Sequence, residues 1–177
     1  DILSIIAGPK SAHAFVEKAG LKSRSVSNCM IIGGGTIAYY LARILLDSHI
    51  DVTIIEKKPE VCKMLAEELP EANIICGDAA NQNVLLEEKI ESIESFVSLT
   101  GMDEENIFLS LFAKKHSNAK LVAKVNKIAF NDVVDSLDID SVIYPKYLTA
   151  DYILQYIRAR QNSSGSNVET LYQLFDG

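Results

Sequence analysis

The chain has 177 residues, 48% of them hydrophobic and 23% charged, with a formal net charge of −7 and a pI of about 5.0. This balance is that of one folded domain with small appendages, and it excludes a disordered chain. The Lys and Arg residues form no long basic run, so no nucleic-acid partner is expected. No stretch approaches the roughly 20 apolar residues of a membrane helix, so no direct membrane insertion is expected.

Strand-like and helix-like patterns alternate along most of the chain. The predicted strands are short apolar runs, as expected for strands covered on both faces: Ile2–Ala7, Asn28–Ile32, Val52–Glu56, Ile74–Cys76, Phe96–Leu99, Leu121–Val125 and Ser141–Ile143. The predicted helices are Ile37–Leu46, Val61–Leu69, Asn106–Lys115 and Leu148–Arg160. This alternation predicts an α/β fold, a doubly wound Rossmann-like parallel sheet of about six strands with helices on both faces, plus a short N-terminal βα unit.

The two ends fit this sheet less well. Residues 1–20 have the pattern of a strand and a helix, and a polar segment follows them. Asn162 begins a Ser/Gly-rich stretch that is typical of a flexible linker. We therefore predict a strand–helix tail at 1–24, a main domain at 25–161, and a linker with the start of another unit at 162–177.

A glycine-rich motif lies between the first strand and the first helix of the main domain. Gly33-Gly34-Gly35-Thr36-Ile37-Ala38 has the GxGxxA form of a dinucleotide-binding loop. Gly33 permits the tight turn, and Gly35 lets a pyrophosphate approach the backbone at the helix N-terminus. The alternative is a glycine turn that binds nothing.

An acidic residue, Glu56, ends the next strand at the position expected for a ribose-binding carboxylate. Its carboxylate can accept hydrogen bonds from the adenosine ribose hydroxyls and would repel a 2′-phosphate, which disfavours NADP. Lys57 follows it, and this lysine either weakens that bias or is simply solvated.

Three further polar residues lie where ligands bind such sheets, outside the carboxyl ends of the strands. Asp78 follows the third strand of the main domain, Thr100 the fourth, and Lys124 ends the fifth. Asp78 can bond to adenine or backbone amides, or it forms only an Asx-turn or a helix cap. Lys124 can reach a phosphate, or it is a solvated surface lysine.

Residues for catalysis are not apparent. His13, His49 and His116 each lie on or next to a predicted helix, so surface histidines are expected. No His/Cys cluster has metal-ligand spacing, and no nucleophile elbow or Walker lysine is present. The three cysteines form no CxxC motif and are expected to be buried free thiols of a reducing cytosol. A non-enzyme is therefore predicted; the alternative is an NAD-dependent oxidoreductase fragment without its catalytic domain.

Several motifs together resemble one known family. They are Ile31–Ile37, Val52–Glu56, Gly77-Asp78-Ala79, Leu99–Asn106, Val122–Asn126, and a late segment from Leu148 to Arg158. In this combination the sequence resembles the regulator-of-potassium-conductance domain (RCK, also called KTN or TrkA-N), specifically the TrkA-type regulatory subunits of potassium uptake. The resemblance covers about residues 28–160.

This resemblance implies a set of nucleotide contacts: Gly33, Gly34, Gly35, Thr36, Ile37, Glu56, Lys57, Asp78, Ala79, Leu99, Thr100 and Lys124. Relatives that bind ATP often carry a basic residue where this chain has Thr36, which favours NAD/NADH here over ATP/ADP or AMP. Where relatives often have arginine, Lys124 keeps the charge without the fork geometry.

The resemblance also implies partners and a setting. It predicts a cytoplasmic sensor, peripheral at the inner face of the plasma membrane, that gates an integral-membrane potassium transporter subunit (TrkH/TrkG-like). It implies a homodimer that assembles into a larger ring. The Leu148–Arg160 helix, with apolar residues such as Tyr152 and Ile153 on one side, is expected to be the crossover element between protomers; the alternative is an amphipathic helix that packs on its own domain. By the same resemblance, 1–24 and 162–177 belong to flanking TrkA-C-like domains. The alternative is an ATP/ADP-gated module of another channel or transporter.

Overall fold

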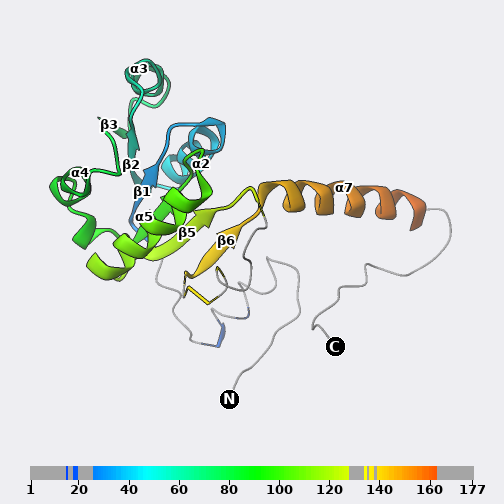
Figure 1. Ribbon diagram of the computed structural model, residues 1–177. Helices are drawn as coiled ribbons and strands as arrows, with labels where there is room; N and C mark the ends of the chain where they lie inside the picture. The colour runs from blue at the N-terminus through cyan, green and yellow to red at the C-terminus, as the bar shows by residue number, and fades with distance from the viewer. Residues whose placement is uncertain are drawn as a thin grey trace.

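The computed structural model describes residues 26–127, 134, 136–137 and 139–162, together with Phe15, Lys18 and Ala19. Six strands form one parallel sheet in the order β3-β2-β1-β4-β5-β6 (Figure 1). They are β1 (Asn28–Ile32), β2 (Asp51–Glu56), β3 (Asn73–Cys76), β4 (Ser95–Ser98), β5 (Lys120–Lys124) and β6 (Ser141–Ile143). The predicted doubly wound sheet is confirmed, and its strand order reverses between β1 and β4.

Helices connect the strands. They are α2 (Thr36–Asp47), α3 (Pro59–Glu68), α4 (Gln82–Glu87), the 3₁₀ turn η1 (Ile90–Ser92), α5 (Asp103–His116) and α7 (Pro145–Asn162). The four predicted helices are all present. Helices α3, α5 and α7 begin two or three residues before their predicted starts, because their first residues include proline and charged side chains. The apolar pattern of the sequence does not predict α4 and η1, because segments this short show no helical period.

Two hydrophobic clusters lie on opposite faces of the sheet. Side chains alternate along each strand, so Cys29 and Ile31 of β1 pack under α2 and α3, while Met30 and Ile32 pack under α4 and α5. Ala38 is 1% exposed, which allows α2 to lie close against the sheet. Both faces are covered, and this explains why the strands are almost continuously apolar.

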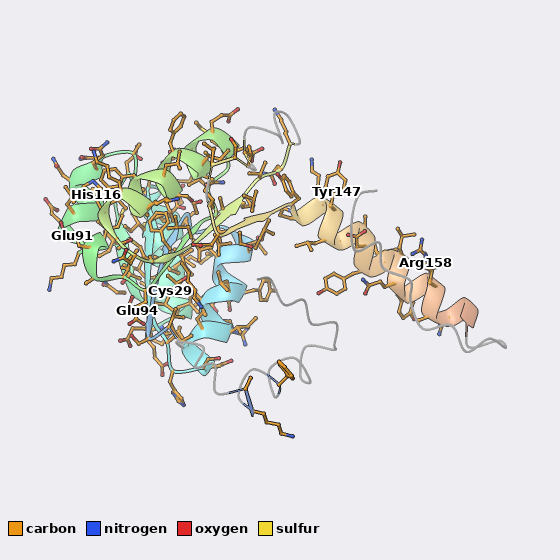
Figure 2. All side chains as sticks on the ribbon, turned by 90° about the horizontal axis from the view of Figure 1, so that it is seen from below. Cys29, Glu91, Glu94, His116, Tyr147 and Arg158 are labelled. Carbon is orange, nitrogen blue, oxygen red and sulfur yellow. The ribbon has the colours of Figure 1, made fainter. Side chains whose placement is uncertain are left out.

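The last helix, α7, differs from the others because it extends away from the sheet (Figure 1). Every residue from 146 to 160 is exposed, and the side chains of Tyr147 and Arg158 lie clear of the body (Figure 2). Within the described part of the chain, no helix combines the length and hydropathy that crossing a membrane requires.

Some predictions concern residues that the structure does not describe. The predicted strand Ile2–Ala7, His13 and the segment after Asn162 all lie outside the described ranges. The N-terminal βα unit and the three-part division of the chain therefore stay predictions.

Candidate nucleotide-binding site

The glycine loop joins β1 to α2 at the carboxyl edge of the sheet. Gly33 has φ +95°, a left-handed conformation that L side chains rarely adopt, and its N–H donates to the carbonyl oxygen of Ile55 at 2.8 Å. A Cβ on Gly33 would lie 3.1 Å from the backbone of Leu99 and Thr100. Glycine is required here both for the turn and for the close approach of the β4 end.

Gly34 and Gly35 have different surroundings. A Cβ on Gly34 would lie 2.7 Å from Leu65 and 2.9 Å from Val61, so α3 packs directly on the loop. A Cβ on Gly35 would meet nothing within 4 Å. Gly35 is the N-cap of α2, where unpaired backbone N–H groups favour an anion. The loop is therefore closed toward α3 and open beside Gly35.

Glu56, the last residue of β2, binds the glycine loop from the strand next to β1. Its Oε2 accepts the Gly34 N–H at 2.6 Å, and its Oε1 accepts the Lys58 N–H at 2.8 Å. Each carboxylate oxygen retains a lone pair for a further donor. The carboxylate thus fixes the loop to the start of α3 and can still accept from ligand hydroxyls.

On the other side of the switch point, a buried asparagine joins the ends of β4 and β5. Asn106 of α5 is 0% exposed. Its Oδ1 accepts the Thr100 N–H at 2.8 Å, and its Nδ2 donates to the carbonyl oxygens of Thr100 at 3.2 Å and Lys124 at 2.9 Å. Asn106 therefore sets the positions of two predicted site residues without facing the pocket itself.

Asp103 ties the same helix to the segment after β5. Its two carboxylate oxygens accept from Asn126 Nδ2 and from the Lys127 N–H, both at 2.9 Å. The Asp-Glu-Glu-Asn opening of α5 thus has a structural explanation. Its first residue anchors the loop after β5, and its last anchors the β4 and β5 ends.

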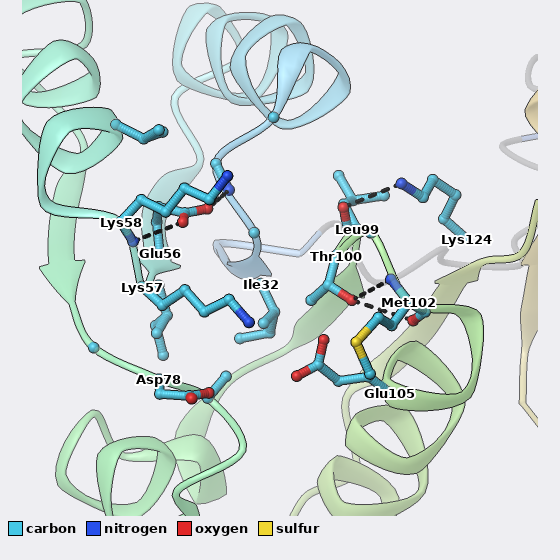
Figure 3. Close-up of a pocket in the computed structure, with 18 residues that line it drawn as sticks. Ile32, Glu56, Lys57, Lys58, Asp78, Leu99, Thr100, Met102, Glu105 and Lys124 are labelled. Atoms are coloured by element: carbon cyan, nitrogen blue, oxygen red, sulfur yellow. Dashed lines mark hydrogen bonds between the residues drawn. The ribbon is translucent and has the colours of Figure 1, made fainter.

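These elements enclose an open pocket of about 420 Å³ (Figure 3), a volume in the range of small-molecule and cofactor sites. Its walls come from the glycine loop, the ends of β2 to β5, and the starts of α3 and α5. The lining includes Gly33, Gly34, Gly35, Glu56, Lys57, Asp78, Ala79, Leu99, Thr100 and Lys124. All the predicted site residues are therefore brought together except Thr36 and Ile37, which lie on the first turn of α2 outside the lining.

Asp78 and Lys124, each predicted with two alternative roles, both make hydrogen bonds to the backbone. Asp78 Oδ1 accepts the Ala80 N–H at 2.9 Å, which is an Asx-turn, although Asp78 also lines the pocket. Lys124 is not a free surface lysine, because it is half-buried and its Nζ donates to the Leu99 carbonyl oxygen at 3.3 Å. The ammonium is thus held at the β4 end of the pocket.

Other residues of interest lie away from the pocket. His49 lies exposed in the turn after α2, as predicted for a surface histidine, whereas His116, the last residue of α5, is half-buried and packs on Phe112. Cys29 and Cys62 are buried as predicted, but Cys76 is exposed, because it ends the outer strand β3. In the described ranges, no group of three or more His, Cys, Asp or Glu could hold a metal ion.

Sequence reasoning missed several residues of the site. Lys58, Met102 and Glu105 also line the pocket, and Asn106 supports it from below. The signal for Glu105 and Asn106 was present in the acidic start of α5. Helical spacing alone cannot show which face of that helix turns toward the ligand edge.

The fold and the pocket together define a Rossmann-like α/β domain with a glycine-loop site at its switch point. The chain belongs to the TrkA-N domain family, whose model matches residues 29–145. It is 31% identical over 171 residues to the Trk system potassium uptake protein TrkA of Haemophilus influenzae, covering 97% of this chain and 36% of the relative. It is 36% identical over 129 residues to the TrkA of Vibrio alginolyticus, covering 73% and 28%. The chain thus spans about a third of the length of these relatives.

Solved structures share the fold at lower identity. The TrkA-N domain of the inner membrane protein ybaL from Escherichia coli has a TM-score of 0.67 and 16% identity, covering 76% of this chain and 98% of that one. The GsuK channel bound to NAD has a TM-score of 0.57 and 17% identity, covering 76% and 25%. These likenesses show a common α/β architecture.

Proposed function

We propose that this domain binds NAD(H) at the glycine-loop pocket and that the bound state regulates a membrane potassium transporter. The observation that carries the proposal is the pairing of an open loop at Gly35 with the carboxylate of Glu56 on the facing strand. An anion at the α2 N-terminus and a ribose near Glu56 are the two halves of dinucleotide recognition. The potassium uptake proteins similar to this chain support the regulatory part.

The charges of the pocket favour a dinucleotide over a triphosphate. The lining carries three carboxylates, Glu56, Asp78 and Glu105, and three lysines, Lys57, Lys58 and Lys124. This formally neutral lining offers no excess of cations for a triphosphate, whereas a pyrophosphate can use the backbone amides at Gly35 and α2. The uncharged Thr36 after the loop adds no cation, so NAD or NADH is the preferred ligand and ATP the weaker one.

We further propose that the domain acts in the cytoplasm, at the inner face of the membrane, as a regulator and not as an enzyme. A TrkH/TrkG-like transporter subunit is the expected partner.

The exposed apolar side chains of α7, such as Tyr152, Ile153 and Tyr156, are expected to pack against a second protomer. A ligand then biases the transporter by binding two arrangements of the protomers with unequal affinity. Residues 1–24 and 162–177 are proposed to belong to flanking TrkA-C-like domains of the longer protein.

Titration calorimetry with NADH, NAD, NADPH, ATP, ADP and AMP tests the ligand. We expect NADH and NAD to bind more tightly than the others, and NADPH to bind weakly because Glu56 repels a 2′-phosphate. Tight ATP binding without NADH binding would contradict the cofactor assignment. It would instead favour an ATP/ADP-gated module.

A pair of substitutions at Gly35 tests the loop. Gly35→Asp and Gly35→Asn have nearly the same size, and the open space at this position accepts either without a clash. We expect the Asp variant to bind NADH at least about tenfold more weakly than the Asn variant, because only the carboxylate repels the pyrophosphate. Equal affinities for the two variants would show that no phosphate lies beside Gly35.

Replacement of the carboxylate tests the whole role of Glu56, which includes both the ribose contact and the hold on the glycine loop. Glu56→Gln keeps the shape but loses the charge, and we expect NADH affinity to fall by about 10- to 100-fold, as for a lost charge-assisted hydrogen bond. Glu60→Gln on the exposed first turn of α3 is the matched control and should bind like the parent. The regulatory role is tested by potassium flux through the transporter, measured together with the regulatory protein. The flux should respond to NADH, and Gly35→Asp should abolish that response.

A further inference from the structure

Two cysteines meet beside Glu56, at the wall of the pocket. Cys76, the last residue of β3, is the ladder partner of Glu56 on β2. Cys62 of α3 donates its Sγ–H to the carbonyl oxygen of Glu56 at 3.1 Å, and the Gly77 N–H donates to that same oxygen at 2.9 Å. One carbonyl oxygen thus brings the Cys62 thiol to the backbone next to Cys76.

The two thiols differ in their access to solvent. Cys62 is only 7% exposed, whereas Cys76 is exposed. Burial raises the pKa of the Cys62 thiol to about 11, and a direct interaction with the Cys76 thiol and the charge of Glu56 add to the rise. Cys62 therefore stays protonated at neutral pH, and Cys76 is the thiol that a solute in water can reach.

We propose that Cys62 and Cys76 form a peroxide-sensitive dithiol site that closes to an intramolecular disulfide at the Glu56 end of the pocket. The Cys76 thiolate attacks one oxygen of hydrogen peroxide, the O–O bond breaks, and hydroxide leaves, so that Cys76 becomes a sulfenic acid. Cys62 sulfur then attacks Cys76 Sγ and gives up its proton, the S–O bond breaks, and water leaves. Two thiols and one peroxide yield one disulfide and two waters.

The closed disulfide changes the pocket wall. It removes the S–H donor from the Glu56 carbonyl oxygen and links α3 to the end of β3. Val61, the neighbour of Cys62, and Gly77, the neighbour of Cys76, both line the pocket, and Val61 also packs against Gly34. Oxidation therefore acts on the part of the site that holds the glycine loop. This consequence rests on the proposed nucleotide function, whereas disulfide formation itself does not.

Peptide mapping tests the bond. The full chain is reduced, exposed to hydrogen peroxide in its folded state, alkylated in denaturant and cut with trypsin, which places Cys29, Cys62 and Cys76 in the separate peptides 25–43, 58–63 and 64–89. We expect a linked pair of peptides 58–63 and 64–89 that disappears with dithiothreitol, while the Cys29 peptide remains alkylated. Oxidation of Cys76 to a sulfinic acid, or its cross-linking between two chains, with Cys62 still alkylated, would overturn the proposal.

Binding measurements test the consequence. Peroxide treatment should weaken NADH binding at least about tenfold in the parent and leave it unchanged in Cys76→Ser, whose exposed position tolerates the replacement. Equal NADH affinity of the mapped disulfide form and the reduced form would overturn the coupling to the pocket. If the reduced chain binds no NADH at all, the proposed function fails, while the peptide map still decides the disulfide.

Discussion

The two sides of the pocket are held in place differently. On the β1–β2 side, Glu56 is expected to contact the ligand and also fixes the glycine loop. On the β4–β5 side, the backbone is fixed by Asn106, which lies outside the pocket lining. Glu56 lines the pocket and accepts the Gly34 N–H. Asn106 is fully buried, yet it fixes the backbone of Thr100 and Lys124. Binding and positioning are combined in one side chain on the first side and separated on the second.

Because of this difference, substitutions on the two sides have different effects. A change at Glu56 alters ligand contacts and loop geometry together, so the change in ligand affinity contains both contributions. A change at Asn106 replaces no pocket-lining residue and removes only the hydrogen bonds that hold the backbone of Thr100 and Lys124. The largest loss of stability is expected for a change at the junction of the two sides, a smaller loss for a change on the second side, and the smallest for a change in the core behind the first side.

The junction of the two sides is Gly33, which contacts the backbone of Leu99 and Thr100. Gly33→Val places a β-branched side chain at φ +95° and 3.1 Å from that backbone. We expect a loss of about 4 kcal/mol in the free energy of unfolding from strain and overpacking together, measured by urea denaturation. Gly101→Ala, where a Cβ meets nothing within 4 Å, should change stability by less than about 0.5 kcal/mol. Similar stabilities for both variants would mean that the two sides do not meet at Gly33.

The second side is tested by Asn106→Leu, which keeps the volume and removes the three hydrogen bonds to Thr100 and Lys124. Because backbone groups are left without partners in the interior, we expect a loss of about 3 kcal/mol in stability. NADH affinity should fall as well, because Thr100 and Lys124 are no longer fixed. Asn118→Ala at an exposed position is the control. An unfolding curve of Asn106→Leu that overlays that of the control would disprove the supporting role.

The hydrophobic cluster that packs under α2 and α3, behind the first side, should respond to alkaline pH. Burial raises the pKa of Cys29 from 9.0 to about 11, partly offset by a hydrogen bond with Ser95, and Cys29 lies under α2 and α3. A raised pKa in the folded chain means that this stabilisation is complete below about pH 9 and is lost as the pH rises toward 11.

At pH 10, Cys29 should therefore contribute about 1 kcal/mol less to stability than at pH 8. Urea denaturation of the parent and of Cys29→Val at pH 8 and pH 10 measures this contribution. It equals the loss of stability between the two pH values in the parent minus the loss in the variant. Asn118→Ala, at an exposed position, should keep the pH dependence of the parent. A Cys29→Val variant as alkali-sensitive as the parent would show that the buried thiol does not titrate in this range.

The strands and their order could be predicted because the relevant signals are local. Short apolar runs such as Asn28–Ile32 were found at their observed bounds, and the alternation with helices allowed only a parallel sheet. Short helices such as α4 were missed, since one or two turns carry no period. Cys76 was wrongly expected to be buried, because an apolar run does not reveal that its strand lies at the edge of the sheet.

The sheet, the glycine loop and the acidic end of β2 can be derived from the amino-acid order, because each depends on residues close together along the chain. Other contacts depend on how the elements pack. Asn106 bridges Thr100 and Lys124, Lys124 is held by Leu99, and Cys62 hydrogen-bonds to Glu56, the ladder partner of Cys76. These contacts join segments whose distance depends on helix rotation and strand register. A linear pattern fixes the face of each element, and packing fixes which residues meet.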